Sequence, residues 1–355
     1  MKALIIKLGS IGDVVHALPA VAAFREALPE AELSWIVDRR SAEILRGSEV
    51  IDDLIEIDTR STRKAGIERM LKEIKHRTNY LRAERFDTAI DMQGLLKSAF
   101  IAKLSGARVR FGFDKGSLRE PASRFLLNRS VHIPPETHII LKNLLIAEAA
   151  AGVSLARSDL QFPISTAAEH IAEAEEIAAN AGGRFAIVNP AGGWPTKLWP
   201  AENYGRLADL LYEELGLYTV VTVGPGEDNL AEKLVSAASR GKVTITKPSL
   251  KGFYELAKRA SVYIGGDTGP THLAVAAGAP VVGIFGPTEW WRNGSPFPDD
   301  IEVGRTDIIC RVNCHRRRCS KWVCMEISPE KVLMAARKRI ENGGKASWDI
   351  LKASK

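Results

Sequence analysis

The chain has 355 residues, of which 45% are hydrophobic and 26% are charged, and its formal net charge is +6 at pH 7. These proportions are ordinary for a soluble globular protein, and the length predicts two domains. The absence of a long apolar run excludes a transmembrane helix, and Lys7 and Asp13 interrupt the apolar start too early for a signal peptide. We therefore expect a cytoplasmic protein whose positive charge suits an anionic partner: nucleic acid, a phosphorylated substrate or an acidic membrane surface.

Strands and helices are predicted to alternate along the first half of the chain. The expected strands are 4–7, 33–37, 51–57, 88–91 and 108–113, and the expected helices are 13–28, 41–46, 67–85 and 94–104. Successive βα units predict a parallel sheet with helices on both faces.

The second half repeats this pattern. The expected strands are 185–189, 219–223, 243–245, 262–265 and 281–285, and the expected helices are 201–215, 229–238 and 250–260. An alanine- and glutamate-rich helix within 160–183 joins the halves. We predict α/β architecture with two doubly wound domains, 1–170 and 171–325, and a basic helical tail at 326–355. Such domains bind ligands in the cleft between them, beyond the carboxyl ends of their strands.

The most informative segment is 266–272, with the sequence GDTGPTH, between a predicted strand and a predicted helix. Glycines allow close approach of the backbone, and the first turn of a helix presents unpaired N–H groups at the positive end of its dipole. The segment predicts a site for a phosphate-bearing ligand with sugar hydroxyls nearby. The alternative is that Asp267 and Thr268 only cap the helix.

Two further segments follow strands of the second half. Lys197 lies in a loop stiffened by three prolines and two tryptophans, where a point charge would suit a diphosphate. Glu227 follows a Gly-Pro-Gly turn and could accept hydrogen bonds from ribose hydroxyls. The alternatives are a solubilising lysine and a glutamate that complements a helix dipole.

A glycine-containing turn, 7–13 (KLGSIGD), ends the first strand. It has two glycines spaced G-x-x-G, so nicotinamide binding is a weak interpretation. Asp13 is either a helix cap or a general base that takes a proton from a hydroxyl group.

Basic residues are concentrated between positions 60 and 85. Most are expected to lie on a solvated helix face. Arg60, Arg63 and Lys64 differ because they precede the helix and directly follow a strand.

All four cysteines, Cys310, Cys314, Cys319 and Cys324, fall within fifteen residues with the spacing C-x3-C-x4-C-x4-C. This spacing is not that of a zinc ribbon. Structural metal binding, free thiols and disulfides stay open, with metal binding placed first and catalysis last.

Taken together, the chain resembles the ADP-heptose:lipopolysaccharide heptosyltransferases, most closely the type I enzymes that add the first heptose to the inner core. The matching segments lie in the same order over nearly the whole chain: 7–19, 91–98 (DMQGLLKS), 116–121 (GSLREP), 190–199 and 266–287. The cysteine-rich segment departs from the plainest type I pattern.

The resemblance implies a GT-B fold, two Rossmann-like domains facing a central cleft, and inverting, metal-independent transfer of heptose from ADP-L-glycero-β-D-manno-heptose to a Kdo hydroxyl of Kdo-lipid A. It implies an enzyme at the inner face of the cytoplasmic membrane that needs no cofactor and binds no nucleic acid. Asp13 would be the base, and Lys197 would assist the departure of ADP. The donor would contact Thr196, Lys197, Glu227, Asp267, Thr268, Gly269, Thr271 and His272, and the acceptor would contact Arg60, Arg63, Lys64, Lys97 and Arg119.

Three alternatives are kept. The acceptor could be an already heptosylated core or another glycan, the chain could be a non-catalytic sugar-nucleotide-binding protein, or it could be a nicotinamide-dependent enzyme. The presence of both Asp13 and Lys197 argues against the loss of catalysis, and the lack of an aromatic stacking pattern argues against nucleic acid.

Overall fold

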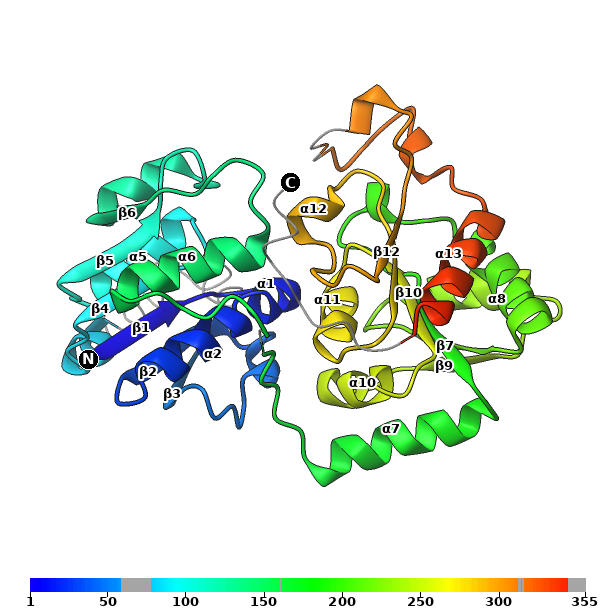
Figure 1. Cartoon of the computed structure of the whole chain (residues 1–355), viewed down its shortest axis with the longest axis horizontal. Coiled ribbons are helices and arrows are strands. Elements are labelled where there is room, and N and C mark those ends of the chain that lie inside the picture. Colours follow the sequence, from blue (N-terminus) through cyan, green and yellow to red (C-terminus); the bar gives the residue numbers. More distant parts are fainter. Residues whose placement is uncertain (59–77, 160, 312–313, 315, 344–355) are drawn as a thin grey trace. The chain divides into compact units, whose positions relative to one another are not determined.

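The strands form two six-stranded parallel sheets, each in its own unit, in the computed structural model of the chain (Figure 1). The structure describes residues 1–58, 78–159, 161–311, 314 and 316–343. The chain divides into two compact units, Met1–Ser165 and Thr166–Lys355. The expected α/β class, with two doubly wound units, is confirmed.

The N-terminal sheet has the strand order β3-β2-β1-β4-β5-β6. Its strands are β1 (Lys2–Ile6), β2 (Glu32–Asp38), β3 (Asp53–Ile57), β4 (Thr88–Asp91), β5 (Val109–Phe113) and β6 (Arg129–Val131). The helices of this unit within the described residues are α1 (Ile11–Val15), α2 (Leu18–Ala27), α5 (Leu96–Leu104) and α6 (Ile139–Ala151), with short 3₁₀ turns η1 (Ala42–Ile44) and η2 (Pro121–Leu126).

The C-terminal sheet has the order β12-β11-β10-β7-β8-β9. Its strands are β7 (Phe185–Asn189), β8 (Tyr218–Thr222), β9 (Val243–Thr246), β10 (Val262–Gly266), β11 (Val281–Ile284) and β12 (Ile301–Val303). Its helices are α7 (Ala168–Ala181), α8 (Ala201–Leu215), α9 (Asp228–Ala237), α10 (Leu250–Ala257), α11 (Gly269–Ala276), α12 (Trp290–Asn293) and α13 (Pro329–Glu341). The described part of the unit also has the 3₁₀ turns η3 (Pro195–Lys197), η4 (Ile309–Arg311) and η5 (Val323–Met325).

Both sheets have the strand order of a dinucleotide-binding fold, in which the chain direction across the sheet reverses beside the first strand. The reversal lies between β1 and β4 in the N-terminal unit and between β7 and β10 in the C-terminal unit. Ligands of such sheets bind beyond the carboxyl ends of the strands at this switch point.

Apolar side chains cover both faces of the sheets, as the nearly continuous hydrophobic strands require. In the C-terminal unit, α8, α9 and α13 bury Leu207, Leu234 and Val332 against one face of the sheet. In the N-terminal unit, Ile6 and Phe86 lie in a cluster with Ala102 of α5. Burial of these surfaces is the main force that stabilises each unit.

Several elements differ from their predicted form. The helix expected at 13–28 is divided into α1 and α2, because Pro19 has no N–H group and its ring would clash with the carbonyl of Val15 in a continuous helix. The helix expected at 41–46 is only the 3₁₀ turn η1. Of the helix expected at 67–85, residues 67–77 lie outside the described part of the chain.

The segment between β5 and α7 holds β6 and α6, which the sequence analysis did not predict. Within the residues that the structure describes, no helix has the length and apolar character needed to cross a membrane.

Candidate functional site

The C-terminal switch point brings together the two segments that the sequence analysis singled out in this half. Asn189, the last residue of β7, lies opposite Gly265 of β10 in the parallel register. The chain then continues from β7 into the loop that carries Lys197, and from β10 into Asp267 and α11. Both segments therefore leave the same edge of the sheet.

Asp267 is the centre of a polar network at this edge. Its carboxylate forms an ion pair with the ammonium group of Lys197, whose Nζ also lies 3.2 Å from the carbonyl oxygen of Asp267. The Asn293 amide donates to Oδ1 of Asp267 at 2.6 Å, and Nε2 of His272 lies 3.3 Å from the same oxygen. The side chains of Lys197 and Asp267 are 9% and 7% exposed, so the network is largely shielded from water.

Burial would by itself raise the pKa of the Asp267 carboxyl. The hydrogen bond from His272 and the charge of Lys197 outweigh burial, and the pKa lies well below its ordinary range. Asp267 is therefore an anion at any physiological pH, and it holds the Lys197 ammonium at the end of the sheet.

The loop that carries Lys197 is held by aromatic residues. The indole ring of Trp194 lies 3.9 Å from Nζ of Lys197, measured to the ring centroid, in a cation–π contact. Trp199 is 1% exposed, packs edge-on against Tyr204 with ring centroids 4.6 Å apart, and donates its indole N–H to the carbonyl of Ile327. The ammonium group thus has little freedom to leave the site.

Thr196 links this loop to the cysteine-rich segment. Its hydroxyl donates to the carbonyl of Arg316 at 2.6 Å, and its own carbonyl accepts the indole N–H of Trp322 at 3.0 Å. The Thr196 hydroxyl group therefore donates its proton to a hydrogen bond within the protein. Thr196 stabilises the loop that carries Lys197.

The turn after β10 presents backbone N–H groups at the start of α11. Thr268 is the N-cap residue, and Thr268 and Gly269 are half-buried, whereas Thr271 is fully buried. The Thr271 hydroxyl donates to the carbonyl of Gly266 and lies 3.0 Å from the hydroxyl of Tyr263. Thr271 therefore fixes the turn that leads into α11, and the positive end of the helix dipole lies at Thr268 and Gly269.

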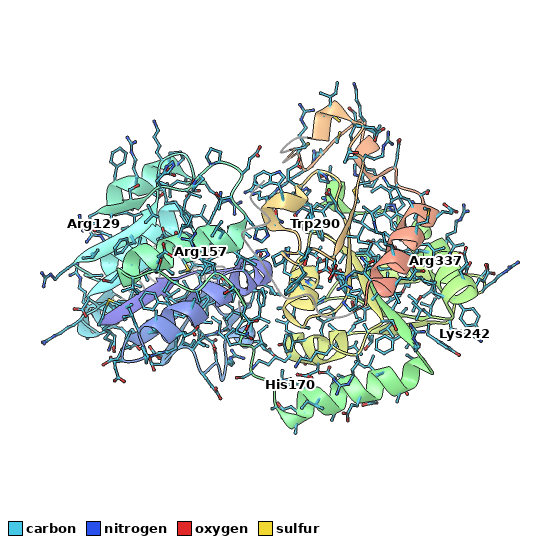
Figure 2. All side chains as sticks on the ribbon, viewed as in Figure 1. Arg129, Arg157, His170, Lys242, Trp290 and Arg337 are labelled. Atoms are coloured by element: carbon cyan, nitrogen blue, oxygen red, sulfur yellow. The ribbon has the colours of Figure 1, made fainter. Side chains whose placement is uncertain are left out.

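The short helix α12 completes this side of the site. Trp290, labelled in Figure 2, begins the helix, and its ring lies edge-on to Phe285 with centroids 4.9 Å apart. Packing of Trp290 places α12 so that Asn293, its last residue, reaches Asp267.

Glu227 follows β8 in the same unit. Its carboxylate accepts the backbone N–H of Gly224 at 2.6 Å, and it stands at the N-cap of α9. The carboxylate closes the Gly-Pro-Gly turn and is half-buried. Glu227 lies beyond the carboxyl end of β8, which is the edge of the sheet at which nucleotides bind in such folds.

At the N-terminal switch point, Asp13 lies in α1 directly after β1. Its Oδ2 accepts the backbone N–H of Ser10 at 2.8 Å, which completes a capping box with the Ser10 residue. Asp13 therefore does cap the helix. Its side chain is half-buried, and the described residues provide no hydrogen bond to Oδ1.

A buried polar group lies beneath this turn. Lys7 is 2% exposed and donates from Nζ to the carbonyl of Met92 at 2.7 Å, while Gln93 accepts the N–H of Leu8 at 2.9 Å. Burial lowers the pKa of Lys7, whereas the charges of Asp13 and Asp91 act to raise it. The lysine is thus close enough to both carboxylates to interact with them electrostatically.

Asp91 is fully buried at the end of β4. Burial raises the pKa of its carboxyl to about 6, although N–H donors of Gln93 and Gly94, the Ser98 hydroxyl and the charge of Lys7 oppose this rise. Its hydrogen bonds, 2.9 Å from Gln93 N and 3.0 Å from Ser98 Oγ, hold the end of β4 against α5.

The expected acceptor-binding residues are only partly described. Lys97 and Arg119 are exposed in the N-terminal unit, and the charge of Arg119 reaches Lys7. Arg60, Arg63 and Lys64 lie outside the described residues.

The four cysteines are free thiols, and the structure does not support the expected structural metal site. Among the residues that the structure describes, no group of three or more His, Cys, Asp or Glu side chains is placed to hold a metal ion. Cys310 and Cys319 are exposed, and Cys314 and Cys324 are half-buried. Burial raises the pKa of the Cys324 thiol, and the other three cysteines act in the same direction.

The sequence analysis gave no site role to four residues of these sites: Trp194, which it counted only among the residues that stiffen the loop, and Asn293, Lys7 and Asp91. Lys7 and Asp91 could have been found, because each lies at the carboxyl end of a predicted strand, the edge at which ligands of such sheets bind. Asn293 carries no such signal, since its place depends on the packing of α12.

Comparison with known proteins identifies the family of the chain. The pattern of glycosyltransferase family 9 (heptosyltransferase) matches residues 75–323. Lipopolysaccharide heptosyltransferase 1 of Escherichia coli K12 is 29% identical over 313 residues, which cover 88% of this chain and 93% of that protein. The enzyme of the same name from Pseudomonas aeruginosa is 26% identical over 324 residues, which cover 90% and 88%.

Solved structures show the same fold. E. coli heptosyltransferase WaaC with ADP-2-deoxy-2-fluoro heptose superposes with a TM-score of 0.74 at 26% identity, covering 97% of this chain and all of that chain. E. coli ADP-heptose lipopolysaccharide heptosyltransferase II gives a TM-score of 0.75 at 18% identity, covering 96% and 99%, which supports the GT-B fold alone. Because the family pattern covers well over half of the sequence, the chain belongs to glycosyltransferase family 9, the heptosyltransferases.

Proposed function

We propose that this glycosyltransferase moves heptose from ADP-L-glycero-β-D-manno-heptose to a Kdo hydroxyl of Kdo-lipid A, in the synthesis of the lipopolysaccharide inner core. The curated relatives named lipopolysaccharide heptosyltransferase 1 support this choice of acceptor, and the WaaC structures with ADP and with an ADP-heptose analogue support the donor.

One observation carries the donor assignment: the buried Lys197–Asp267 pair at the switch point, next to the N-terminus of α11. A diphosphate placed there would meet the Lys197 ammonium and the N–H groups at Gly269. Glu227, beyond the neighbouring strand, would accept hydrogen bonds from the ribose hydroxyls. Thr268 and His272 would contact the phosphate or the heptose, and Thr196 and Thr271 would act by holding the two loops.

The proposed reaction is a direct displacement. The Asp13 carboxylate takes the proton of the acceptor hydroxyl, the acceptor oxygen bonds to the anomeric carbon, and the bond from that carbon to the β-phosphate oxygen breaks. ADP leaves with the electron pair, and Lys197 and the N-terminus of α11 stabilise the charge that develops on it. Displacement from the opposite face inverts the configuration of the anomeric carbon.

On the acceptor side, Lys97 and Arg119 would bind the carboxylates and phosphates of Kdo-lipid A, together with Arg60, Arg63 and Lys64. In this proposal the enzyme makes peripheral contact with an anionic membrane, because the acceptor is carried on a lipid. That Asp13 and Lys197 act on one donor–acceptor pair stays a prediction, which the variants in the Discussion test.

The deciding experiment is a transfer assay with ADP-heptose and two acceptors, Kdo-lipid A and its heptosylated product, with a reaction without acceptor as the control. We expect stoichiometric release of ADP and formation of heptosylated Kdo-lipid A with the first acceptor, an inverted anomeric centre by NMR, and no loss of rate in EDTA. Transfer only to the heptosylated product would assign a later step of core synthesis. Binding of ADP-heptose without transfer to any acceptor would favour a non-catalytic sugar-nucleotide-binding protein.

A further inference from the structure

Large apolar side chains are exposed on two adjoining elements of the N-terminal unit, α5 and η2. Leu96 and Phe100 of α5 are 43% and 45% exposed, and Phe125 of η2 is 75% exposed. A single exposed apolar residue needs no explanation, but these three lie on two elements that pack against each other. We call these three residues the apolar patch.

The helix α5 has two distinct faces. Leu96 and Phe100 are four residues apart and therefore lie on the same face. Ser98 and Ala102 are buried on the far side of the helix, against the body of the unit, and the buried Ala99 lies between the two faces. One face of α5 therefore exposes Leu96 and Phe100 to solvent, and its buried side chains anchor the helix to the unit.

The segment before η2 is attached to the start of α5. The Glu120 carboxylate accepts the backbone N–H of Leu96 at 2.6 Å. At the other end of η2, the guanidinium group of Arg124 lies 4.6 Å from the ring centroid of Phe125. A cation and an aromatic ring are therefore exposed together at this end of η2.

The surroundings of the apolar patch are positively charged. Residues 96–104 and 119–126 contain the cations Lys97, Lys103, Arg119 and Arg124, all exposed, and the single carboxylate Glu120. That carboxylate is engaged with the N-terminus of α5. The combination of exposed aromatic and aliphatic groups with surrounding cations is complementary to an anionic lipid surface.

We propose that this face of α5 and η2 docks on an anionic lipid bilayer. Leu96, Phe100 and Phe125 enter the boundary between head groups and acyl chains, and Lys103 and Arg124 contact lipid phosphates. The docking surface borders Lys97 and Arg119, so a lipid-linked acceptor would be presented next to the residues proposed to bind it. This last point rests on the proposed function, whereas the docking itself does not.

The test is co-sedimentation of the full chain with vesicles. We expect wild-type protein to bind vesicles of phosphatidylethanolamine and phosphatidylglycerol and to bind pure phosphatidylcholine vesicles weakly. Phe100→Ser/Phe125→Ser should weaken binding to the anionic vesicles roughly tenfold or more, because two apolar side chains no longer leave water. Lys103→Glu/Arg124→Glu should weaken it roughly tenfold or more at low salt, since each cation near such a surface contributes to binding.

Two controls keep the result interpretable. Met334→Ser alters a residue of α13 that is 71% exposed in the other unit, and it should leave vesicle binding unchanged. Phe125→Ser alone changes the most exposed of the three residues, so it should weaken binding in a protein with an unchanged melting temperature.

Unchanged vesicle binding in both double variants would overturn the proposal. So would a wild-type dimer that the apolar variants convert to a monomer without any effect on vesicle binding, because the patch would then be a contact between copies of the chain. Transfer to a deacylated, water-soluble acceptor should be equal in wild type and the Phe variants. Absence of that transfer in wild type would contradict the proposed function and leave the vesicle result as an independent outcome.

Discussion

The ammonium group of Lys197 and the carboxylate of Asp267 form a buried ion pair although 70 residues separate them in the chain. The pair forms because β7 and β10 are neighbours in the sheet, so the segments that follow them leave the same edge. In a site shielded from water, this ammonium group is held in one place before any anionic ligand arrives.

We expect Lys197→Met to lower turnover by about 10²–10³, since it removes the charge proposed to stabilise departing ADP. It should also lower the free energy of unfolding by about 3–5 kcal/mol, because the Asp267 charge stays buried without its partner. The double variant Lys197→Met/Asp267→Asn should recover much of this stability but none of the activity. Urea denaturation and steady-state kinetics measure the two effects, and Lys233→Met, an exposed lysine of α9, is the matched control. Full turnover in the double variant would contradict the role of Lys197.

Asp13→Asn should lower turnover by on the order of 10²–10⁴, because an amide cannot take the hydroxyl proton. The asparagine oxygen can still accept the N–H of Ser10, so the helix cap and the fold should be retained. Calorimetric titration with ADP should give the same affinity as wild type. Glu30→Gln, at an exposed position, serves as the control for loss of a carboxylate. Wild-type turnover by the Asp13 variant would refute its assignment as the base.

Trp194→Leu should raise the KM for the donor by about fivefold to thirtyfold, the equivalent of losing a shielded cation–π contact with Lys197. Trp194→Phe keeps an aromatic face beneath the ammonium group and should restore most of the affinity. The two variants should have similar kcat values if the ring only positions the lysine. Equal KM values for both variants would show that the aromatic face has no part in donor binding.

Titration of the Asp91 carboxyl should make the free energy of unfolding depend on pH. Its pKa is about 6 in the folded chain against an ordinary 3.8, so the folded state binds this proton more tightly than the unfolded state. Its contribution to stability therefore falls as the pH rises from about 4 to 6 and is constant above that range, a change of about 3 kcal/mol in total. Asp91→Asn does not titrate, so its stability relative to wild type should rise over the same range. Parallel curves for the two proteins, measured by urea denaturation, would contradict this account.

Thiol reactivity should distinguish the cysteines. Backbone N–H groups of Trp322 and Lys321 lower the pKa of the exposed Cys319, whereas burial raises the pKa of Cys324. Because the thiolate is the reactive species, a disulfide reagent at pH 7 should modify Cys319 before Cys324. Mass spectrometry of the digested protein gives this order. Equal protection of all four thiols, lost on addition of a chelator, would instead reveal a bound metal.

Local sequence was enough to predict most of the strands and the α/β class of the fold. The apolar strands at 4–7, 88–91, 185–189 and 262–265 are bounded by turns and charged residues, and their alternation with helices indicates parallel sheets. Pro19 shows the limit of this reasoning, since the apolar periodicity continues through it although the hydrogen-bonded helix does not. The helix α6 went unpredicted because it is apolar on more than one side and has little amphipathic pattern.

By itself, the sequence determined that Asp13, Lys197 and Asp267 follow strands of doubly wound sheets, because strand ends and helix starts depend on neighbouring residues. Only the tertiary structure decided which of these groups meet. The pairing of Lys197 with Asp267, the approach of Asn293 from α12 and the burial of Lys7 beside Asp91 all depend on strand order and packing. Such contacts join residues far apart in the chain, and their energies arise only when the sheet has formed and water has been excluded.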